Sequence, residues 1–139
     1  MIAVVDASVA VKWFLTVSPE EPDSSIALGI LNDAAQGSLR LWQPPHFIAE
    51  VASVLARLKP TDALLDIRDL MELDFERIED DAVYAHAAEL AITLGHHLFD
   101  TLYHSLALSE ADATLVTADR HYYRKARGYG AIELLENWH

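Results

Sequence analysis

Short apolar segments alternate along the chain with longer segments whose apolar residues recur at helical spacing. Apolar runs of about four to eight residues between turn signals are typical of buried strands, and longer periodic segments are typical of helices. Strands alternating with helices predict an α/β fold with a mainly parallel sheet covered on both faces. We expect strands at residues 2–5, 39–42, 75–79, 113–119 and 131–135, and helices at residues 7–15, 24–37, 44–59, 61–73, 81–95, 98–110 and 120–128.

The size and composition predict one packed domain spanning residues 1–139, with a break between the first two helices at Pro19 and Pro22. Hydrophobic residues make up 52% of the chain, yet no apolar run approaches the ~20 residues of a membrane span. No Lys or Arg precedes position 12, and Asp6 interrupts the first apolar run, which argues against a signal peptide. We therefore expect a cytoplasmic protein. The absence of cysteine excludes disulfides and thiolate metal sites.

The net charge of −12 argues against a protein that coats nucleic acid, because such binding depends on Lys and Arg neutralising phosphates. It does not exclude an enzyme that acts on nucleic acid. Four of the ten basic residues lie within residues 120–127, "RHYYRKAR", and form a candidate basic patch on an acidic protein.

Four acidic residues stand at positions where a sheet of this kind binds ligands. Asp6 and Asp119 follow two predicted strands, and the carboxyl ends of parallel strands meet at one edge. On helical wheels Glu50 and Asp100 lie on the shoulders of two apolar faces, beside the core. Those faces consist of Phe47, Ile48, Val51, Val54, Leu55 and Leu58 in one helix, and of Phe99, Leu102, Tyr103 and Leu106 in the other.

Each of the four acids also has a purely structural interpretation. Asp6 and Asp119 are suited to cap the helices that follow them, Asp100 suits the first turn of its helix, and Glu50 suits a solvated position. Six further acids are interpreted as solvated, namely Asp62, Asp66, Asp69, Glu72, Asp80 and Asp81.

The four acids together have a consequence that none of them has alone. Two carboxylates about 5 Å apart repel each other by about 3 kcal/mol at an effective dielectric constant near 20. A hard divalent cation such as Mg²⁺ relieves this repulsion by taking carboxylate oxygens as ligands. The four acids together therefore predict a metal centre.

These segments resemble a known family. "VVDASV", Glu50 in an early helix, "LFDTLYHSLAL" and "LVTADRHYYRKA" are similar to the PIN-domain nucleases, and above all to the VapC-type toxins of toxin–antitoxin pairs. The resemblance covers nearly the whole chain. It implies a three-layer α/β/α sandwich with a mainly parallel sheet. It also implies an endoribonuclease dependent on Mg²⁺ or Mn²⁺, usually a homodimer, which a cognate antitoxin inhibits.

The resemblance assigns the acidic quartet to Asp6, Glu50, Asp100 and Asp119. We expect Asp6, Glu50 and Asp100 to bind the first ion, directly or through water, and Asp119 to complete the site or help bind a second ion. A water activated by the metal would then hydrolyse an RNA phosphodiester and leave a 5′-phosphate.

The same resemblance suggests that Ser8 or Thr117 provides a hydroxyl beside the site. A structural role, as a helix cap or a strand-end hydroxyl, is equally consistent with either residue. Candidate contacts to RNA or to an antitoxin are Lys12, His104, Arg120, Arg124, Lys125 and Arg127. A snorkelling surface role also fits Lys12, and Tyr122 and Tyr123 fit either the core or base stacking. His96 and His97 are disfavoured as zinc ligands, because no second histidine follows at metal-binding spacing.

Other classes of protein are less consistent with the sequence. A receiver-type phosphoacceptor module needs paired acids after its first strand, and a haloacid-type phosphatase needs D-x-D there, whereas the chain has "DAS". A phosphatase-like Mg²⁺-dependent hydrolase and a metal-binding α/β module without nuclease activity remain the alternatives.

Overall fold

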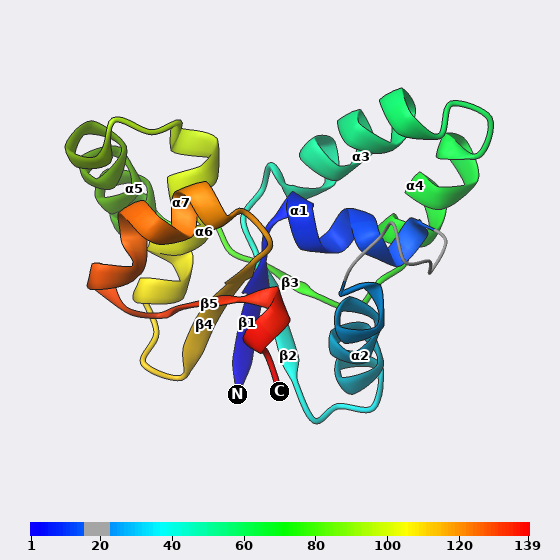
Figure 1. Cartoon of the computed structure of the whole chain (residues 1–139), viewed down its shortest axis with the longest axis horizontal. Coiled ribbons are helices and arrows are strands. Elements are labelled where there is room, and N and C mark those ends of the chain that lie inside the picture. Colours follow the sequence, from blue (N-terminus) through cyan, green and yellow to red (C-terminus); the bar gives the residue numbers. More distant parts are fainter. Residues whose placement is uncertain (16–22) are drawn as a thin grey trace.

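The computed structural model describes residues 1–15 and 23–139, so the predicted break at Pro19 and Pro22 lies outside the described residues. Five strands form one parallel sheet in the order β3-β2-β1-β4-β5 (Figure 1). The strands are β1 (Ile2–Val5), β2 (Arg40–Gln43), β3 (Glu76–Arg77), β4 (Ala113–Thr117) and β5 (Ile132–Leu134). The prediction of a mainly parallel sheet is confirmed.

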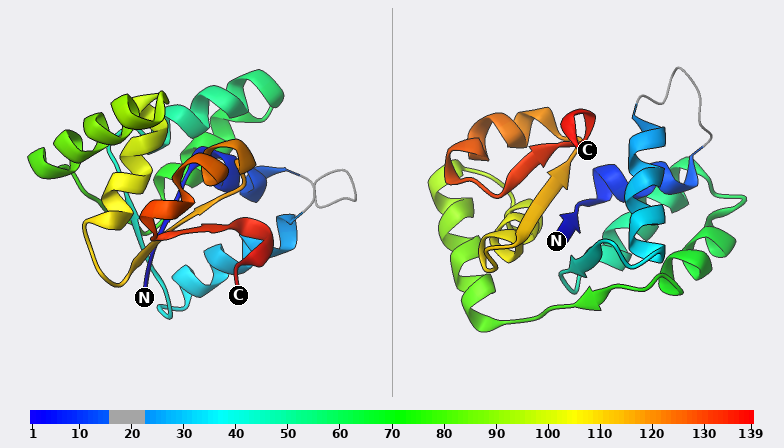
Figure 2. Two further views of the ribbon diagram at one scale, coloured as in Figure 1. Left: turned by 60° about the vertical axis from the view of Figure 1, so that its left-hand side comes forward. Right: turned by 90° about the horizontal axis from the view of Figure 1, so that it is seen from below.

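Helices cover both faces of the sheet. The first group comprises α1 (Ala7–Ala10), the 3₁₀ helix η1 (Val11–Phe14), α2 (Ser24–Ala35), α3 (Phe47–Leu58) and α4 (Ala63–Met71). The second comprises α5 (Asp81–Leu94), α6 (Leu98–Leu108), α7 (Arg120–Ala126) and the 3₁₀ helix η2 (Arg127–Tyr129), and η3 (Leu135–Asn137) follows β5. The strands run between the two groups in each view, which confirms the α/β/α sandwich (Figures 1 and 2).

The strand order explains why one sheet edge is suited to a site. From β1 the chain moves outward to β2 and β3, then returns through α5 and α6 to β4 on the other side of β1. Ligands in such sheets bind beyond the carboxyl ends of the strands, where the order reverses. Here that point lies between β1 and β4, whose pairing runs from Ile2–Ala113 to Val5–Val116.

Two predicted elements differ from the structure in extent. The helix expected at residues 7–15 is a single α-helical turn, α1, continued by the 3₁₀ helix η1. The strand expected at residues 75–79 is reduced to two exposed residues, Glu76 and Arg77, at the edge of the sheet. Edge strands have a partner on one side only, so their sequences carry a weaker signal of burial.

The two helical wheels were correct for most of each face and wrong at the ends. Val51, Leu55 and Leu106 are fully buried, whereas Leu58 is 51% exposed at the end of α3 and Phe99 is 61% exposed in the first turn of α6. The Phe99 ring lies against His46, with 5.4 Å between ring centroids, instead of entering the core. In the described part of the chain no helix has the length and apolar character needed to cross a membrane.

Candidate metal centre

Asp6 stands directly after β1 and is held by hydroxyl groups from α1 and from the end of β4. Its Oδ1 accepts hydrogen bonds from the backbone N–H (3.1 Å) and the hydroxyl of Ser8, and its Oδ2 accepts one from the hydroxyl of Thr117. Asp6 therefore caps α1, as its structural interpretation predicted, and is also fixed toward β4.

The hydroxyls of Ser8 and Thr117 join the ends of β1 and β4. The Ser8 Oγ accepts from the N–H of Ala118, and the Thr117 Oγ1 accepts from the N–H of Asp119, each at 3.0 Å. Asp119 in turn caps α7, because its Oδ1 accepts from the N–H of Tyr122 at 3.0 Å. Both hydroxyls thus orient the acids, where the sequence left the choice between them open.

Glu50 reaches the same edge from the first turn of α3. Its Oε1 accepts a hydrogen bond of 3.1 Å from the buried hydroxyl of Tyr103, which α6 supplies. The Nε2 of His46 lies 3.9 Å from the Glu50 Oε2 and 2.8 Å from the carbonyl oxygen of Phe99. Glu50 is therefore hydrogen-bonded to α6, the helix that also carries Asp100.

Asp100 lies in the first turn of α6 beside a partly buried histidine. The Nε2 of His96 is 2.8 Å from the Asp100 Oδ2. Among the described residues, His96, Asp100 and Asp119 can each offer a ligand atom, and these atoms lie within 4.8 Å of one another. The structure thus brings together Asp119, which caps α7 after β4, and Asp100 of α6.

The negative charge of Asp100 acts on both Asp6 and Glu50, and that of Asp6 also acts on Glu50. The pKa of Asp6 is raised to about 6, because burial and the negative charge of Asp100 together outweigh the hydrogen bonds from Ser8 and Thr117 that lower it. Burial raises the pKa of Glu50 to about 7, and the charges of Asp100 and Asp6 contribute, against the Tyr103 hydrogen bond. Burial and the same three carboxylates also raise the pKa of Tyr103.

This charge has little compensation from the chain itself. Among the described residues other than Lys12, no lysine or arginine forms an ion pair with Asp6, Glu50, Asp100 or Asp119. Carboxylate and hydroxyl oxygens are hard donors of the kind that Mg²⁺ and Mn²⁺ prefer. The residues present therefore fit a divalent cation.

The contact between Tyr103 and Glu50 leads to a test. Tyr103→Phe removes the hydrogen bond that orients the Glu50 carboxylate and lowers its pKa, and it keeps the buried ring. We expect Mn²⁺ binding at pH 7 to weaken by about ten-fold, as measured by isothermal titration calorimetry. The control is Tyr122→Phe, because among the described residues the Tyr122 hydroxyl forms a hydrogen bond with His104 and with none of the four acids. Equal Mn²⁺ affinities of the two variants would contradict this role of Tyr103.

Two hollows flank the acids. One of about 670 Å³ is lined by residues that include His96, Asp100, Asp119 and Lys125. The other, of about 260 Å³, is lined by His46, Ala49, Glu50, Ser53 and Phe99. Space for a ligand is thus available on both sides of the carboxylates.

The basic residues proposed as contacts differ in their surroundings. Arg124 and Arg127 are exposed, and Lys12 is half-buried in η1. Arg120 pairs with Glu136 at the surface. The ammonium group of Lys125 lies against the last carbonyls of α5, 3.3 Å from the oxygen of Leu94.

The prediction of an RNA or antitoxin contact is wrong for His104. This side chain is 0% exposed, and its two ring nitrogens lie 2.9 Å from the Tyr122 hydroxyl and 2.8 Å from the carbonyl oxygen of Gly130. The position one turn after Asp100 suggested the site, but α6 is buried on several sides, so that turn faces the core. The contact also shows that Tyr122 belongs to the core.

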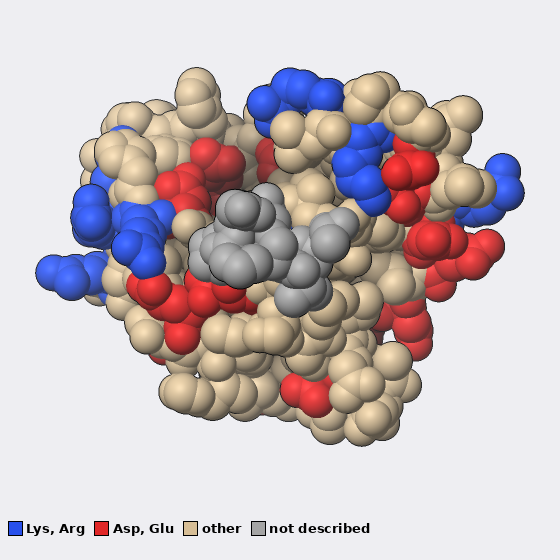
Figure 3. All heavy atoms as spheres, turned by 45° about the vertical axis from the view of Figure 1, so that its right-hand side comes forward, with Lys and Arg blue, Asp and Glu red and all other residues tan. Residues whose placement is uncertain are grey.

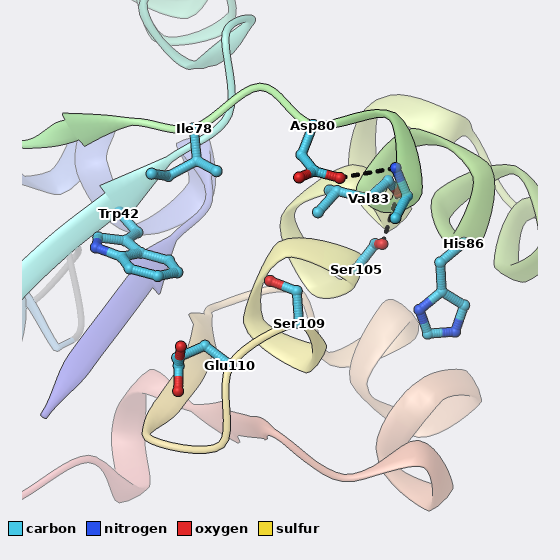
Figure 4. Close-up of a pocket in the computed structure, with 9 residues that line it drawn as sticks. Trp42, Ile78, Asp80, Val83, His86, Ser105, Ser109 and Glu110 are labelled. Carbon is cyan, nitrogen blue, oxygen red and sulfur yellow. Dashed lines mark hydrogen bonds between the residues drawn. The ribbon is translucent and has the colours of Figure 1, made fainter.

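Another pocket contains none of the predicted site residues. It has a volume of about 620 Å³ and lies between the β2–β3 edge and the α5–α6 pair (Figure 4). Its lining combines the Trp42 ring with Asp80, His86, Ser109 and Glu110, and its Ser105 hydroxyl donates to the Val83 carbonyl at 2.7 Å.

The fold and the acid cluster define a parallel α/β protein with a carboxylate centre at the switch point. The PIN domain family model matches residues 3–128, and the chain belongs to this family. No curated protein sequence matches the chain significantly.

Solved structures show the same fold at low sequence identity. A crystal structure of PAE2754 from Pyrobaculum aerophilum is 23% identical (TM-score 0.66), with 98% of this chain and 93% of that chain covered. VapBC2 from Rickettsia felis, bound to a DNA fragment from its promoter, is 20% identical (TM-score 0.67; 96% and 98% covered). VapBC-1 from nontypeable Haemophilus influenzae is 16% identical (TM-score 0.66; 99% and 100% covered).

Proposed function

We propose that the protein is a metal-dependent endoribonuclease and the toxin of a VapBC-type toxin–antitoxin pair. The observation that carries this proposal is that the pKa values of Asp6, which follows β1, and of Glu50, in α3, are both raised, with a contribution from the charge of Asp100 in α6. Structural neighbours that are VapBC complexes support the toxin assignment.

In this proposal Asp6, Glu50 and Asp100 hold a Mg²⁺ or Mn²⁺ ion, and Asp119 completes the site. A divalent cation bound there supplies positive charge against the phosphodiester and lowers the pKa of a water molecule. The chain supplies the orientation of the acids. Ser8 and Thr117 fix both oxygens of Asp6, and Tyr103 fixes one oxygen of Glu50.

RNA reaches such a site over a surface of mixed charge. Acidic and basic side chains are interspersed on the face seen in Figure 3, without one continuous basic surface. We propose that Arg124, Arg127 and Lys12 contact RNA phosphates, and that the exposed Phe99 ring beside Glu50 contacts a base. Local contacts of this kind suit an enzyme that binds a short stretch of RNA.

We further propose an antitoxin partner and a homodimer. The basic residues of α7 suit an acidic antitoxin segment, whose binding would compete with RNA. Several large apolar side chains of α3 and α4 are exposed and suit a protein interface. They are Leu58 (51%), Leu64 (81%), Leu65 (61%) and Met71 (66%). The cytoplasmic location expected from the sequence stays a prediction.

The proposal is tested by incubating the purified protein with a mixture of structured RNAs. We expect cleavage with Mg²⁺ or Mn²⁺, no cleavage with EDTA, and products that carry a 5′-phosphate and a 3′-hydroxyl. Cleavage that persists in EDTA, or that leaves a 2′,3′-cyclic phosphate, would contradict the proposal. Metal binding without cleavage of any RNA or phosphate ester would instead favour a binding module.

A further inference from the structure

His96 lies at the junction between α5 and α6, close to the proposed metal ligands. Gly95 ends α5 in the left-handed conformation, at φ 59°, and the N–H of His96 then bonds to the carbonyl of Ala91 at 3.0 Å. His97 precedes α6, and its carbonyl accepts from the N–H of Asp100 at 3.1 Å. The backbone therefore fixes the positions of both His96 and Asp100.

The His96 ring is held at both nitrogens. Its Nε2 lies 2.8 Å from the Asp100 Oδ2, and its Nδ1 lies 3.3 Å from the Nζ of Lys125. The His96 side chain is only 9% exposed, whereas that of Asp100 is 38% exposed. A ring packed so closely, 4.9 Å from the ring of Tyr122, has little freedom to rotate.

Lys125 reaches His96 from α7 and is itself fixed. Its Nζ lies 3.3 Å from the carbonyl oxygen of Leu94 and 3.4 Å from that of Gly95. These are carbonyls at the carboxyl end of α5, where a positive charge is stabilised by the helix dipole. Lys125 thus ties α7 to the turn that carries His96.

These contacts determine which ring nitrogen carries the proton. A lysine ammonium has donors only, so the His96 Nδ1 that faces it accepts a hydrogen bond. In the neutral ring the proton is then on Nε2, which donates to the Asp100 Oδ2. A histidine that binds a metal through Nε2 would need to donate from Nδ1, and here Nδ1 faces a cation.

We propose that His96, oriented by Lys125, is a positioning residue that holds Asp100 in place for the metal ion and is not itself a ligand. The inference rests on the proposed metal centre. The hydrogen bond occupies the Asp100 Oδ2 and turns its Oδ1 in one fixed direction, which lowers the entropy lost when an ion binds. One ring nitrogen of His96 lies within 4.8 Å of the ligand atoms of Asp100 and Asp119, so direct ligation is the competing outcome.

Mn²⁺ titrations followed by electron paramagnetic resonance test the proposal in wild type, His96→Leu, His96→Gln and His97→Leu. The amide nitrogen of a glutamine replaces the Nε2–H donor, whereas leucine removes it. We expect Mn²⁺ affinity to fall by about 10- to 100-fold in His96→Leu, and to stay within about three-fold of wild type in His96→Gln. His97→Leu is the matched control, because the neighbouring side chain is exposed, and it should bind Mn²⁺ as wild type does.

The spin-echo spectrum of the bound Mn²⁺ separates positioning from ligation. We expect no ¹⁴N coupling of the size that a coordinated imidazole gives. Strong ¹⁴N coupling in wild type, an unchanged affinity in His96→Leu, or a His96→Gln variant as weak as His96→Leu would each overturn the proposal. A wild-type protein that binds no Mn²⁺ would refute the proposed function itself, and the inference with it.

Lys125→Met keeps the test valid if His96→Leu does not fold. It leaves the imidazole in place but removes the donor to Nδ1, so the ring loses its orientation. We expect Mn²⁺ affinity to fall several-fold in this variant, with the melting temperature in EDTA as the check of folding. A folded Lys125→Met protein with wild-type Mn²⁺ affinity would overturn the proposed chain of contacts from Lys125 to Asp100.

Discussion

Replacement of Asp6 by asparagine is expected to lower the rate of RNA cleavage by more than about 100-fold. Loss of an outer-shell partner of a metal costs up to about 100-fold, and we expect loss of a proposed ligand to cost more. Asp6 accepts hydrogen bonds at both oxygens from Ser8 and Thr117. An amide retains one acceptor and loses the negative charge. The measurement is single-turnover cleavage of a labelled RNA at saturating Mg²⁺.

Asp80→Asn is the matched control for this substitution. Asp80 also caps a helix, since its Oδ1 accepts from the N–H of Ala82 at 2.8 Å, but it pairs with none of the four acids. Both variants therefore exchange a capping carboxylate for an amide that can still cap, and only Asp6→Asn also loses a proposed metal ligand. Comparable cleavage rates of the two variants would contradict the role given to Asp6.

Millimolar Mn²⁺ is expected to raise the melting temperature, and to raise it more at pH 8 than at pH 5. Burial and neighbouring charges raise the pKa of Asp6 from 3.8 to about 6 and that of Glu50 from 4.5 to about 7. An ion binds the deprotonated carboxylates, so at low pH it must displace protons from Asp6 and Glu50, which weakens its binding. At 100 times the dissociation constant the ion contributes about 2.7 kcal/mol, on the order of 8 °C for a chain of this size.

The metal-free protein should show the opposite dependence on pH. Between about pH 4 and pH 7 the folded state binds more protons at Asp6 and Glu50 than the unfolded state does. Their contribution to the free energy of unfolding is therefore fully present below about pH 4 and is lost as the pH rises through about 7. Thermal melts in EDTA measure this trend.

Glu50→Gln tests whether this pH dependence comes from the acids of the site and not from other ionisable groups. The variant cannot deprotonate at this position, so its melting temperature in EDTA should fall less between pH 5 and pH 8 than that of wild type. Its response to Mn²⁺ should also be smaller. Identical pH trends and Mn²⁺ responses in Glu50→Gln and wild type would refute the coupling between this acid and the ion.

The parts of this site that the sequence predicted follow from topology. Asp6 and Asp119 come directly after apolar strands, and parallel strands place their carboxyl ends at one edge. The helical spacing of apolar residues placed Glu50 and Asp100 at the borders of the apolar faces of their helices. The adjacency of β1 and β4, which brings these elements together, was not predicted from the sequence, because no local pattern encodes which strands pair.

The parts that the sequence missed depend on tertiary contacts. Tyr103 was assigned to the core, and its ring is buried there, but its hydroxyl donates to Glu50 from a different helix. His96 was considered only as a zinc ligand with a second histidine, although its spacing of four residues from Asp100 was a signal for a contact across the start of α6. The prediction that residues 1–139 form a single domain stays a prediction.

The central claim is that strand ends and two helices bring Asp6, Glu50 and Asp100 to one divalent ion. A crystal grown with Mn²⁺ and measured at the manganese absorption edge tests it directly. We expect an anomalous difference peak within bonding distance of the carboxylate oxygens of Asp6 and Asp100, close to Glu50. A map with no peak there at saturating Mn²⁺, and with the three side chains directed away from one another, would contradict it.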